Sequence, residues 1–340
     1  MKNWNDIKNE FENGLIFLGN GSSIALNKKF VYKDIREYAS KNRYINDEVN
    51  NVFDKLDTVN FEKVLEYLYK ASIVNEILKI DHEKPKKLHD ELKNGLINSV
   101  RDMHPSYKEI IEDLKKIKKF LDTFKVVIDL NYDLIAYWGI MLDSKGKNFD
   151  DFFGQGGILK NHNEIQRIIR KEKIIIYPHG SLFICKSEKS DTIKEGAQSV
   201  EEGQELKISG NKSEDILSVI QNTDFLEPVF VAEGTNEQKV EMIKNSHYLG
   251  TVLEILPEVK FDSFTFLGFS FNENDEHIVN QLAKGRMGKI KISVSVHENN
   301  PGTITDANKM LKSCFRENCE IKFFDVATCG WPQRSEENNN

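Results

Sequence analysis

The chain of 340 residues has few cysteines, no long hydrophobic run and no excess of positive charge. Its four cysteines form no C-x-x-C pair, so we expect neither a disulfide framework nor a structural zinc site. No apolar run approaches the roughly 20 residues that cross a bilayer, and the N-terminus lacks the apolar core of a signal peptide. The net charge of −7 provides no basic field for nucleic acid. These absences predict a cytoplasmic protein with no membrane, metal or direct nucleic-acid partner.

Short apolar runs alternate with amphipathic segments along most of the chain. The content of 39% apolar and 30% charged residues is typical of a globular protein. We expect strands at residues 15–18, 125–130, 174–177, 228–232, 264–267, 290–296 and 321–324. This alternation predicts an α/β protein with an open, doubly wound and mostly parallel Rossmann-like sheet.

One long helical block interrupts the alternation at residues 33–121, where the only prolines are Pro85 and Pro105. A helical stretch of this length between two strands indicates an insertion and not an ordinary crossover. We expect residues 1–32 and 122–330 to form the core, and residues 331–340 to form a disordered tail. The charged helix faces of the insertion predict an interaction or gating element outside the ligand site; a passive cap is the alternative.

The first apolar run leads directly into a turn of glycine and small polar residues, namely Gly19, Asn20, Gly21, Ser22 and Ser23. Glycines let the backbone approach a ligand, and the N–H groups at a helix start favour an anion such as a pyrophosphate. The third glycine of the usual dinucleotide fingerprint is absent. A short glycine turn is also an ordinary connector, so this motif alone is weak.

Polar residues follow four of the expected strands: the turn from Gly19 to Ser23, then Asn131 and Asp133, then His179 and Gly180, then Gly268 and Ser270. In open α/β sheets, ligands bind beyond the carboxyl ends of the strands. We therefore expect these residues to share one crevice. Each also has an ordinary structural interpretation, since Asn, Asp and Ser can cap helices and a histidine can serve in a turn.

The four motifs, in this order, resemble the sirtuin catalytic core. The resemblance is closest to the bacterial sirtuin-like proteins that consume NAD in antiphage defence, and it covers about residues 1–32 and 122–300. It implies a pyrophosphate cradle made of Gly19, Asn20, Gly21, Ser22 and Ser23. It also implies that Asn131 holds the nicotinamide ribose and the attacking water, and that Asp133 meets the carboxamide.

For the remaining motifs, the resemblance implies that His179, followed by Gly180, contacts the ribose hydroxyls as the acid/base group. It further implies that Gly268 and Ser270, with Asp275, line the adenosine side. Sirtuin deacetylases also carry two C-x-x-C pairs that hold zinc, and a Pro-Asp-Phe-Arg element after the glycine turn. This chain has neither; the residues after the turn read Ile-Ala-Leu-Asn.

Without the zinc module, the resemblance implies an NAD glycohydrolase that releases nicotinamide and ADP-ribose without a metal. It implies an antiphage effector that assembles as a homo-oligomer or acts with a separate ATPase or sensor protein. Two alternatives remain open. One is an NAD-dependent ADP-ribosyl or acyl-lysine transferase, and the other is a sensor that binds NAD or ADP-ribose without turnover.

Overall fold

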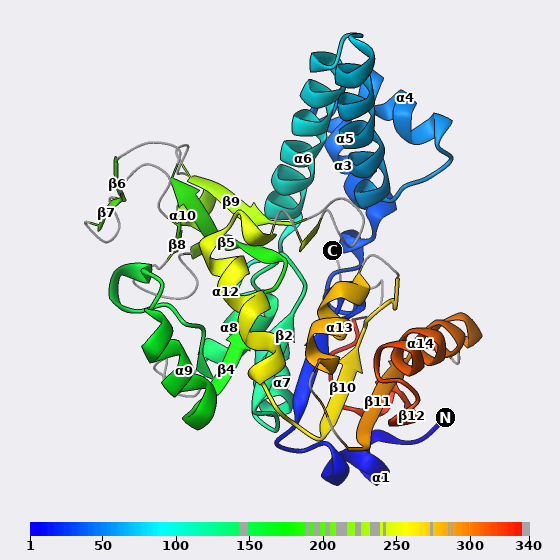
Figure 1. The fold of residues 1–340 in the computed structure, drawn as a ribbon, viewed down its shortest axis with the longest axis vertical. Helices are drawn as coiled ribbons and strands as arrows, with labels where there is room; N and C mark the ends of the chain where they lie inside the picture. Colours follow the sequence, from blue (N-terminus) through cyan, green and yellow to red (C-terminus); the bar gives the residue numbers. More distant parts are fainter. Residues whose placement is uncertain are drawn as a thin grey trace.

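The protein is built around a seven-stranded sheet in which every pairing is parallel (Figure 1). The computed structural model describes residues 1–142, 149–187, 191–193, 198–200, 205–208, 216–221, 226–231, 239–240, 243–272, 275–284, 286, 288–298 and 300–334. The strand order is β12-β11-β10-β1-β2-β4-β3. The strands are β1 (Leu15–Leu18), β2 (Val126–Asp129), β3 (Phe149–Asp150), β4 (Lys173–Ile176), β10 (Ser263–Leu267), β11 (Ile290–Val296) and β12 (Cys319–Asp325). The predicted fold class, a doubly wound α/β protein, is confirmed.

Strand β1 lies at the centre, and all four of its residues are fully buried. Its last residue, Leu18, is in register with Leu267 of β10 on one side and with Asp129 of β2 on the other. The rings of Phe17 and Phe266 stack across β1 and β10 with centroids 4.4 Å apart. The three strands therefore end at the same level, which places their following loops side by side.

Helices flank this sheet (Figure 1). They are α1 (Trp4–Ile7), α2 (Asn20–Ile24), α7 (Ile111–Leu121), α8 (Ile135–Met141), α9 (His162–Lys171), α12 (His247–Ile255), α13 (Glu276–Ala283) and α14 (Pro301–Cys314). Among the residues that the structure describes, no helix is long and apolar enough to cross a bilayer.

The helical insertion projects from the sheet as α3 (Tyr32–Lys41), α4 (Asp47–Lys55), α5 (Phe61–Leu78) and α6 (Glu83–Met103) (Figure 1). Helices α5 and α6 pack against each other along the projecting part. Helix α7, which the sequence placed in the insertion, packs instead on α8 beside the sheet. The projecting part thus ends with α6 and not at residue 121. Helical periodicity cannot reveal this boundary, because α6 and α7 are both amphipathic.

The strand expected at residues 228–232 forms, but not in the central sheet. Strand β9 (Leu226–Phe230) pairs antiparallel with β5 (Gly180–Ser187), which also pairs with β8 (Glu205–Lys207). Residue 232 lies outside the described residues. Strands β6 (Asp191–Ile193) and β7 (Gln198–Val200) form a separate pair, and α10 covers Ile216–Gln221. The prediction of a central strand was wrong because an apolar run does not specify its partner.

The first residues of the expected disordered tail are packed against the protein. Trp331 is buried, and its Nε1–H donates to the carbonyl of Ser22 at 3.0 Å. The backbone N–H of Arg334 donates to the carbonyl of Ala25 at 2.8 Å. The structure therefore differs from the prediction for residues 331–334, and residues 335–340 lie outside the described part.

Candidate functional site

A cavity of about 960 Å³ opens beyond the carboxyl ends of β1, β2, β4 and β10. Its volume is at the upper end of the range of roughly 300–1,000 Å³ that ligand pockets occupy. The predicted residues that line it are Gly19, Asn20, Gly21, Ser22, Asn131, Asp133, His179, Gly268, Ser270 and Asp275. Ser23 and Gly180 are not among the lining residues: Ser23 lies behind Asp133, and Gly180 begins β5. The crevice predicted at the strand ends is therefore present.

The glycines of the first turn let two loops touch. The N–H of Gly21 donates to the carbonyl of Gly268 at 2.9 Å, and a Cβ on Gly19 would lie 2.6 Å from that same oxygen. Gly268 has φ +63°, and a Cβ on it would lie 2.2 Å from the nitrogen of Ser22. These positions thus serve the close packing of the loops after β1 and β10. Their role as a pyrophosphate cradle stays a prediction.

Asn131 is held in place at the end of β2. Its Nδ2 donates to Ser22 Oγ at 3.1 Å, and Ser22 Oγ in turn donates to the carbonyl of Gly19 at 2.8 Å. The backbone N–H of Asn131 donates to Asp129 Oδ1 at 3.1 Å. Within the described part of the chain, no hydrogen bond to Asn131 Oδ1 is found. The amide is thus fixed by its nitrogen, and its oxygen is available to a ligand in the cavity.

Asp133 uses both of its carboxylate oxygens within the protein. Ser23 Oγ donates to Oδ2 at 2.5 Å, and the N–H of Ile135 donates to Oδ1 at 2.8 Å. The second of these contacts spans two residues and holds the turn before α8, whose N-cap residue is Leu134. Nearby, the buried His104 accepts from the N–H of Leu134 at 2.9 Å, and burial lowers its pKa. These contacts fix the start of α8 beneath the cavity.

Asp129, the last residue of β2, is a buried carboxyl that the sequence reasoning did not single out. It is fully buried, and its Oδ2 has no hydrogen-bond partner among the described residues. Burial, and then the charge of Asp133, raise the pKa of Asp129 well above its usual value. The sequence did carry a signal for this residue, because Asp129 is an acidic residue at the end of an otherwise apolar strand.

His179 lies in a buried cluster of titratable groups. Its Nε2 is 3.4 Å from His277 Nε2 and 3.9 Å from Asp275 Oδ1. Burial is the main cause that lowers the pKa of His179 well below its usual value; the charges of Lys239 and His277 act in the same direction, and Asp275 opposes them. The imidazole is therefore neutral at neutral pH and can accept a proton.

Lys239, which the sequence reasoning missed, is completely buried beside this histidine. Its Nζ lies 3.1 Å from Asp275 Oδ1 and 3.3 Å from Glu62 Oε2, and Tyr32 Oη donates to Glu62 Oε1 at 3.1 Å. Burial alone would lower the pKa of Lys239, but Glu62 and Asp275 raise it above its usual value. The lysine is therefore an ammonium ion held between two carboxyl groups. No local sequence signal marks it.

The insertion contributes directly to the cavity. Asn60 and Glu62 at the start of α5, with Leu96 and Val100 of α6, are among the lining residues. The insertion therefore lines the cavity, and the expectation that it lies outside the ligand site stays a prediction that conflicts with a ligand in this cavity. The pattern of charged and apolar residues within each helix gave no sign that three helices, α3, α5 and α6, would meet the strand ends.

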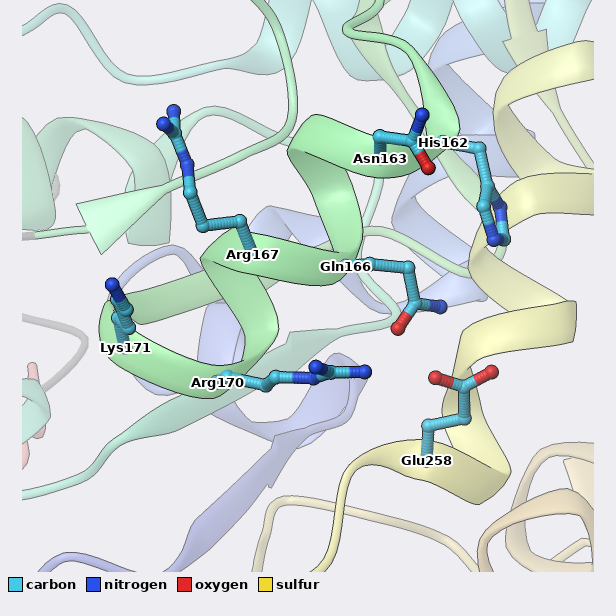
Figure 2. A pocket seen from close by; sticks show the side chains of 7 residues that line it. All are labelled: His162, Asn163, Gln166, Arg167, Arg170, Lys171 and Glu258. Atoms are coloured by element: carbon cyan, nitrogen blue, oxygen red, sulfur yellow. The ribbon is translucent and has the colours of Figure 1, made fainter.

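A second hollow of about 620 Å³ lies between α9 and the turn of Leu256–Glu258 (Figure 2). In Figure 2, the side chains of Gln166 and Arg170 point toward Glu258, whereas Arg167 and Lys171 point away from it. The lining residues are His162, Asn163, Gln166, Arg167, Arg170, Lys171 and Glu258, and most of them are exposed. None of the predicted site residues lies there. This hollow lacks the convergent buried polar groups of the strand-end cavity.

The four cysteines lie in the described ranges and are free. In the same ranges, no group of three or more His, Cys, Asp or Glu residues could hold a metal ion. A comparison with curated proteins found no match. A family described as a domain of unknown function (DUF4917) matches residues 16–331, which extend from β1 through the insertion to Trp331. The chain therefore belongs to the DUF4917 family.

Proposed function

We propose that the protein is an NAD glycohydrolase that cleaves NAD into nicotinamide and ADP-ribose. The observation that carries this proposal is the cavity at the strand ends, which is lined by both a neutral, buried histidine, His179, and a fixed asparagine amide, Asn131. The order of these residues along the chain is the order that resembles the sirtuin core. The same resemblance supports an antiphage role and homo-oligomers or a partner ATPase or sensor as further proposals.

The reaction requires little from the protein. The bond between the ribose C1′ and the nicotinamide nitrogen breaks, and its electron pair returns to the pyridinium ring, so nicotinamide leaves as a neutral molecule. A water oxygen then bonds to C1′ and gives up a proton. The transition state resembles the oxocarbenium ion of glycoside hydrolysis. The site must hold the ribose, direct the water and accept its proton.

We assign these tasks to the residues whose free atoms suit them. Asn131 Oδ1 can accept a hydrogen bond from the water, because Ser22 holds its Nδ2. His179 is neutral at neutral pH because burial lowers its pKa, so a ring nitrogen has a free lone pair for the proton. Asp133 has both oxygens engaged, so we assign it a positioning role in place of direct contact with the carboxamide. The turn from Gly19 to Ser23 remains our proposal for the pyrophosphate.

Incubation of the purified protein with NAD, followed by quantification of nicotinamide and ADP-ribose, tests the proposal. Asn131→Ala and His179→Ala should each reduce the rate by at least about a hundredfold, because each removes a positioned proton-transfer or water-orienting group. His162→Ala is a matched control, since His162 is an exposed histidine of the second hollow. It should leave the rate unchanged.

Circular dichroism must show that the variants are folded. Near-normal turnover in folded Asn131→Ala and His179→Ala would contradict the site assignment. NAD or ADP-ribose that stays bound without turnover would favour the sensor alternative. We also expect the activity to survive EDTA; a loss restored by zinc would favour the acyl-lysine transferase alternative.

A further inference from the structure

We propose that Lys239 is a positioning residue for His179, and that the helical insertion acts on this histidine through the contact of Glu62 with Lys239. The catalytic part of this inference rests on the proposed function, in which His179 accepts the proton. The part that concerns the ionisation of His179 does not depend on NAD.

The contacts form a chain from the insertion to the histidine. Glu62 belongs to α5, and its Oε2 lies 3.3 Å from Lys239 Nζ. The same ammonium group lies 3.1 Å from Asp275 Oδ1. That oxygen is also the atom of Asp275 that faces His179, at 3.9 Å from Nε2. Lys239 and His179 therefore compete for one carboxylate oxygen, and the lysine is the closer of the two.

The outcome of this competition fixes the state of the histidine. A carboxylate bound to an ammonium ion stabilises a nearby imidazolium less than a free carboxylate does. The other titratable groups near His179 are His277 of α13, which also disfavours a positive imidazole, and Glu62, with Tyr32, on the far side of the lysine. With Lys239 in place, the balance favours the neutral ring, which is the form that can accept a proton.

The insertion affects His179 because Lys239 pairs both with Glu62 of the insertion and with Asp275 beside the histidine. Glu62 lies in the first turn of α5, a helix of 18 residues whose far end projects from the protein (Figure 1). A displacement of this helix would withdraw Glu62 and leave the full charge of Lys239 to Asp275 and His179. A partner that binds the projecting pair of helices α5 and α6 could therefore alter the ionisation of His179 without entering the cavity.

The direct test measures the pKa of His179 by NMR in protein with labelled histidine side chains, with its signal assigned by comparison with His179→Gln. In Lys239→Met, Asp275 is free to pair with the imidazolium, so the pKa should rise by about one pH unit or more. In the double variant Lys239→Met with Glu62→Gln, one nearby negative charge is also removed. The pKa should then lie above that of the wild type and below that of the single variant.

Lys84→Met is the matched control, because Lys84 also pairs with a glutamate of the insertion, Glu48 at 2.6 Å, but on an exposed surface. It should leave the pKa of His179 unchanged. If Lys239→Met does not fold because two carboxylates lose their ammonium partner, the double variant, in which Asp275 alone of the two is still charged, decides the role of Lys239. A wild-type pKa in the folded double variant would overturn the role of Lys239. Equal values in the single and double variants would overturn the role of Glu62.

The pH dependence of kcat/KM for NAD cleavage supplies the second readout. Because a raised pKa protonates the base at higher pH, the acid limb of the profile should move upward in Lys239→Met with the pKa of His179. If the pKa values shift as expected but no NAD is cleaved, the proposed function fails and the coupling stands. If NAD is cleaved and the pKa of His179 does not change in Lys239→Met, the coupling between Lys239 and His179 is contradicted and the proposed function is not.

Discussion

The two sides of the strand-end cavity are built by different means. The neutral side is made of Gly19, Ser22, Asn131 and Gly268, which follow β1, β2 and β10 and are held by backbone contacts and uncharged hydrogen bonds. The charged side joins Glu62, Lys239 and Asp275 through partly buried ion pairs, with the neutral His179 at 3.9 Å from Asp275. Substitutions on the neutral side should therefore act through steric clashes, whereas substitutions on the charged side should act by changing which groups are ionised.

The largest expected effect concerns the neutral side, where Gly268→Ala should destabilise the protein by about 3 kcal/mol or more. The alanine would combine a positive φ with overpacking, because its Cβ would lie 2.2 Å from the nitrogen of Ser22. Urea denaturation measures the loss. Gly330→Ala is the matched control, since Gly330 has φ +81° with nothing within 4 Å of its Cβ position. Its cost should be about 1–2 kcal/mol; equal losses would show that loop contact at Gly268 is unimportant.

A smaller effect is expected at Asp129, the one strongly perturbed carboxyl beneath the neutral side. Its pKa is raised by burial and by Asp133, so its favourable contribution is complete below its unfolded pKa and is lost as the pH rises through its folded pKa. Asp129→Asn keeps the shape without a proton to lose. It should therefore stabilise the protein more at pH 8 than at pH 4.

Thermal unfolding of wild type and Asp129→Asn at the two pH values measures this gain. The wild type at pH 4 serves as the internal reference, because the gain should be smallest there. A gain that is equal at both pH values, or larger at pH 4, would mean that Asp129 ionises without difficulty in the folded protein. A charge on Asp129 would then be tolerated directly beneath the neutral side, and the contrast between the two sides would weaken.

The contrast also explains which parts could be predicted from the sequence. Residues of the neutral side directly follow apolar strands, and strands in register end at one level, so their meeting could be predicted from order alone. His179 and Asp275 could be placed in the same way. Lys239 and Glu62 could not, because their contact joins residues 177 positions apart through the placement of α5.

The same physical limit accounts for the errors in the fold. The apolar run of β9 fits any sheet, so its pairing with β5 and not with the central sheet could not be predicted. The polar content of the last ten residues suggested disorder, yet Trp331 packs against Phe120 and donates to Ser22. In both cases the local pattern could not show which distant residues the segment would contact, and that contact decided the outcome.

The smallest expected effect compares one hydrogen bond from each side. Trp331→Phe removes the Nε1–H donated to the carbonyl of Ser22, and Tyr32→Phe removes the hydroxyl donated to Glu62 Oε1. Each should cost about 1 kcal/mol at neutral pH.

The pKa of Glu62 is raised, chiefly by burial, and the Tyr32 hydroxyl counteracts this by favouring the ionised carboxylate. The cost of Tyr32→Phe should therefore grow as the pH rises through the pKa of Glu62, because the lost bond matters most to the charged form. Since the bond of Trp331 joins two uncharged groups, the cost of Trp331→Phe should be the same at pH 5 and pH 8. Urea denaturation at both pH values distinguishes the two, and an equal pH dependence would place both bonds in one electrostatic environment and remove the distinction between the sides.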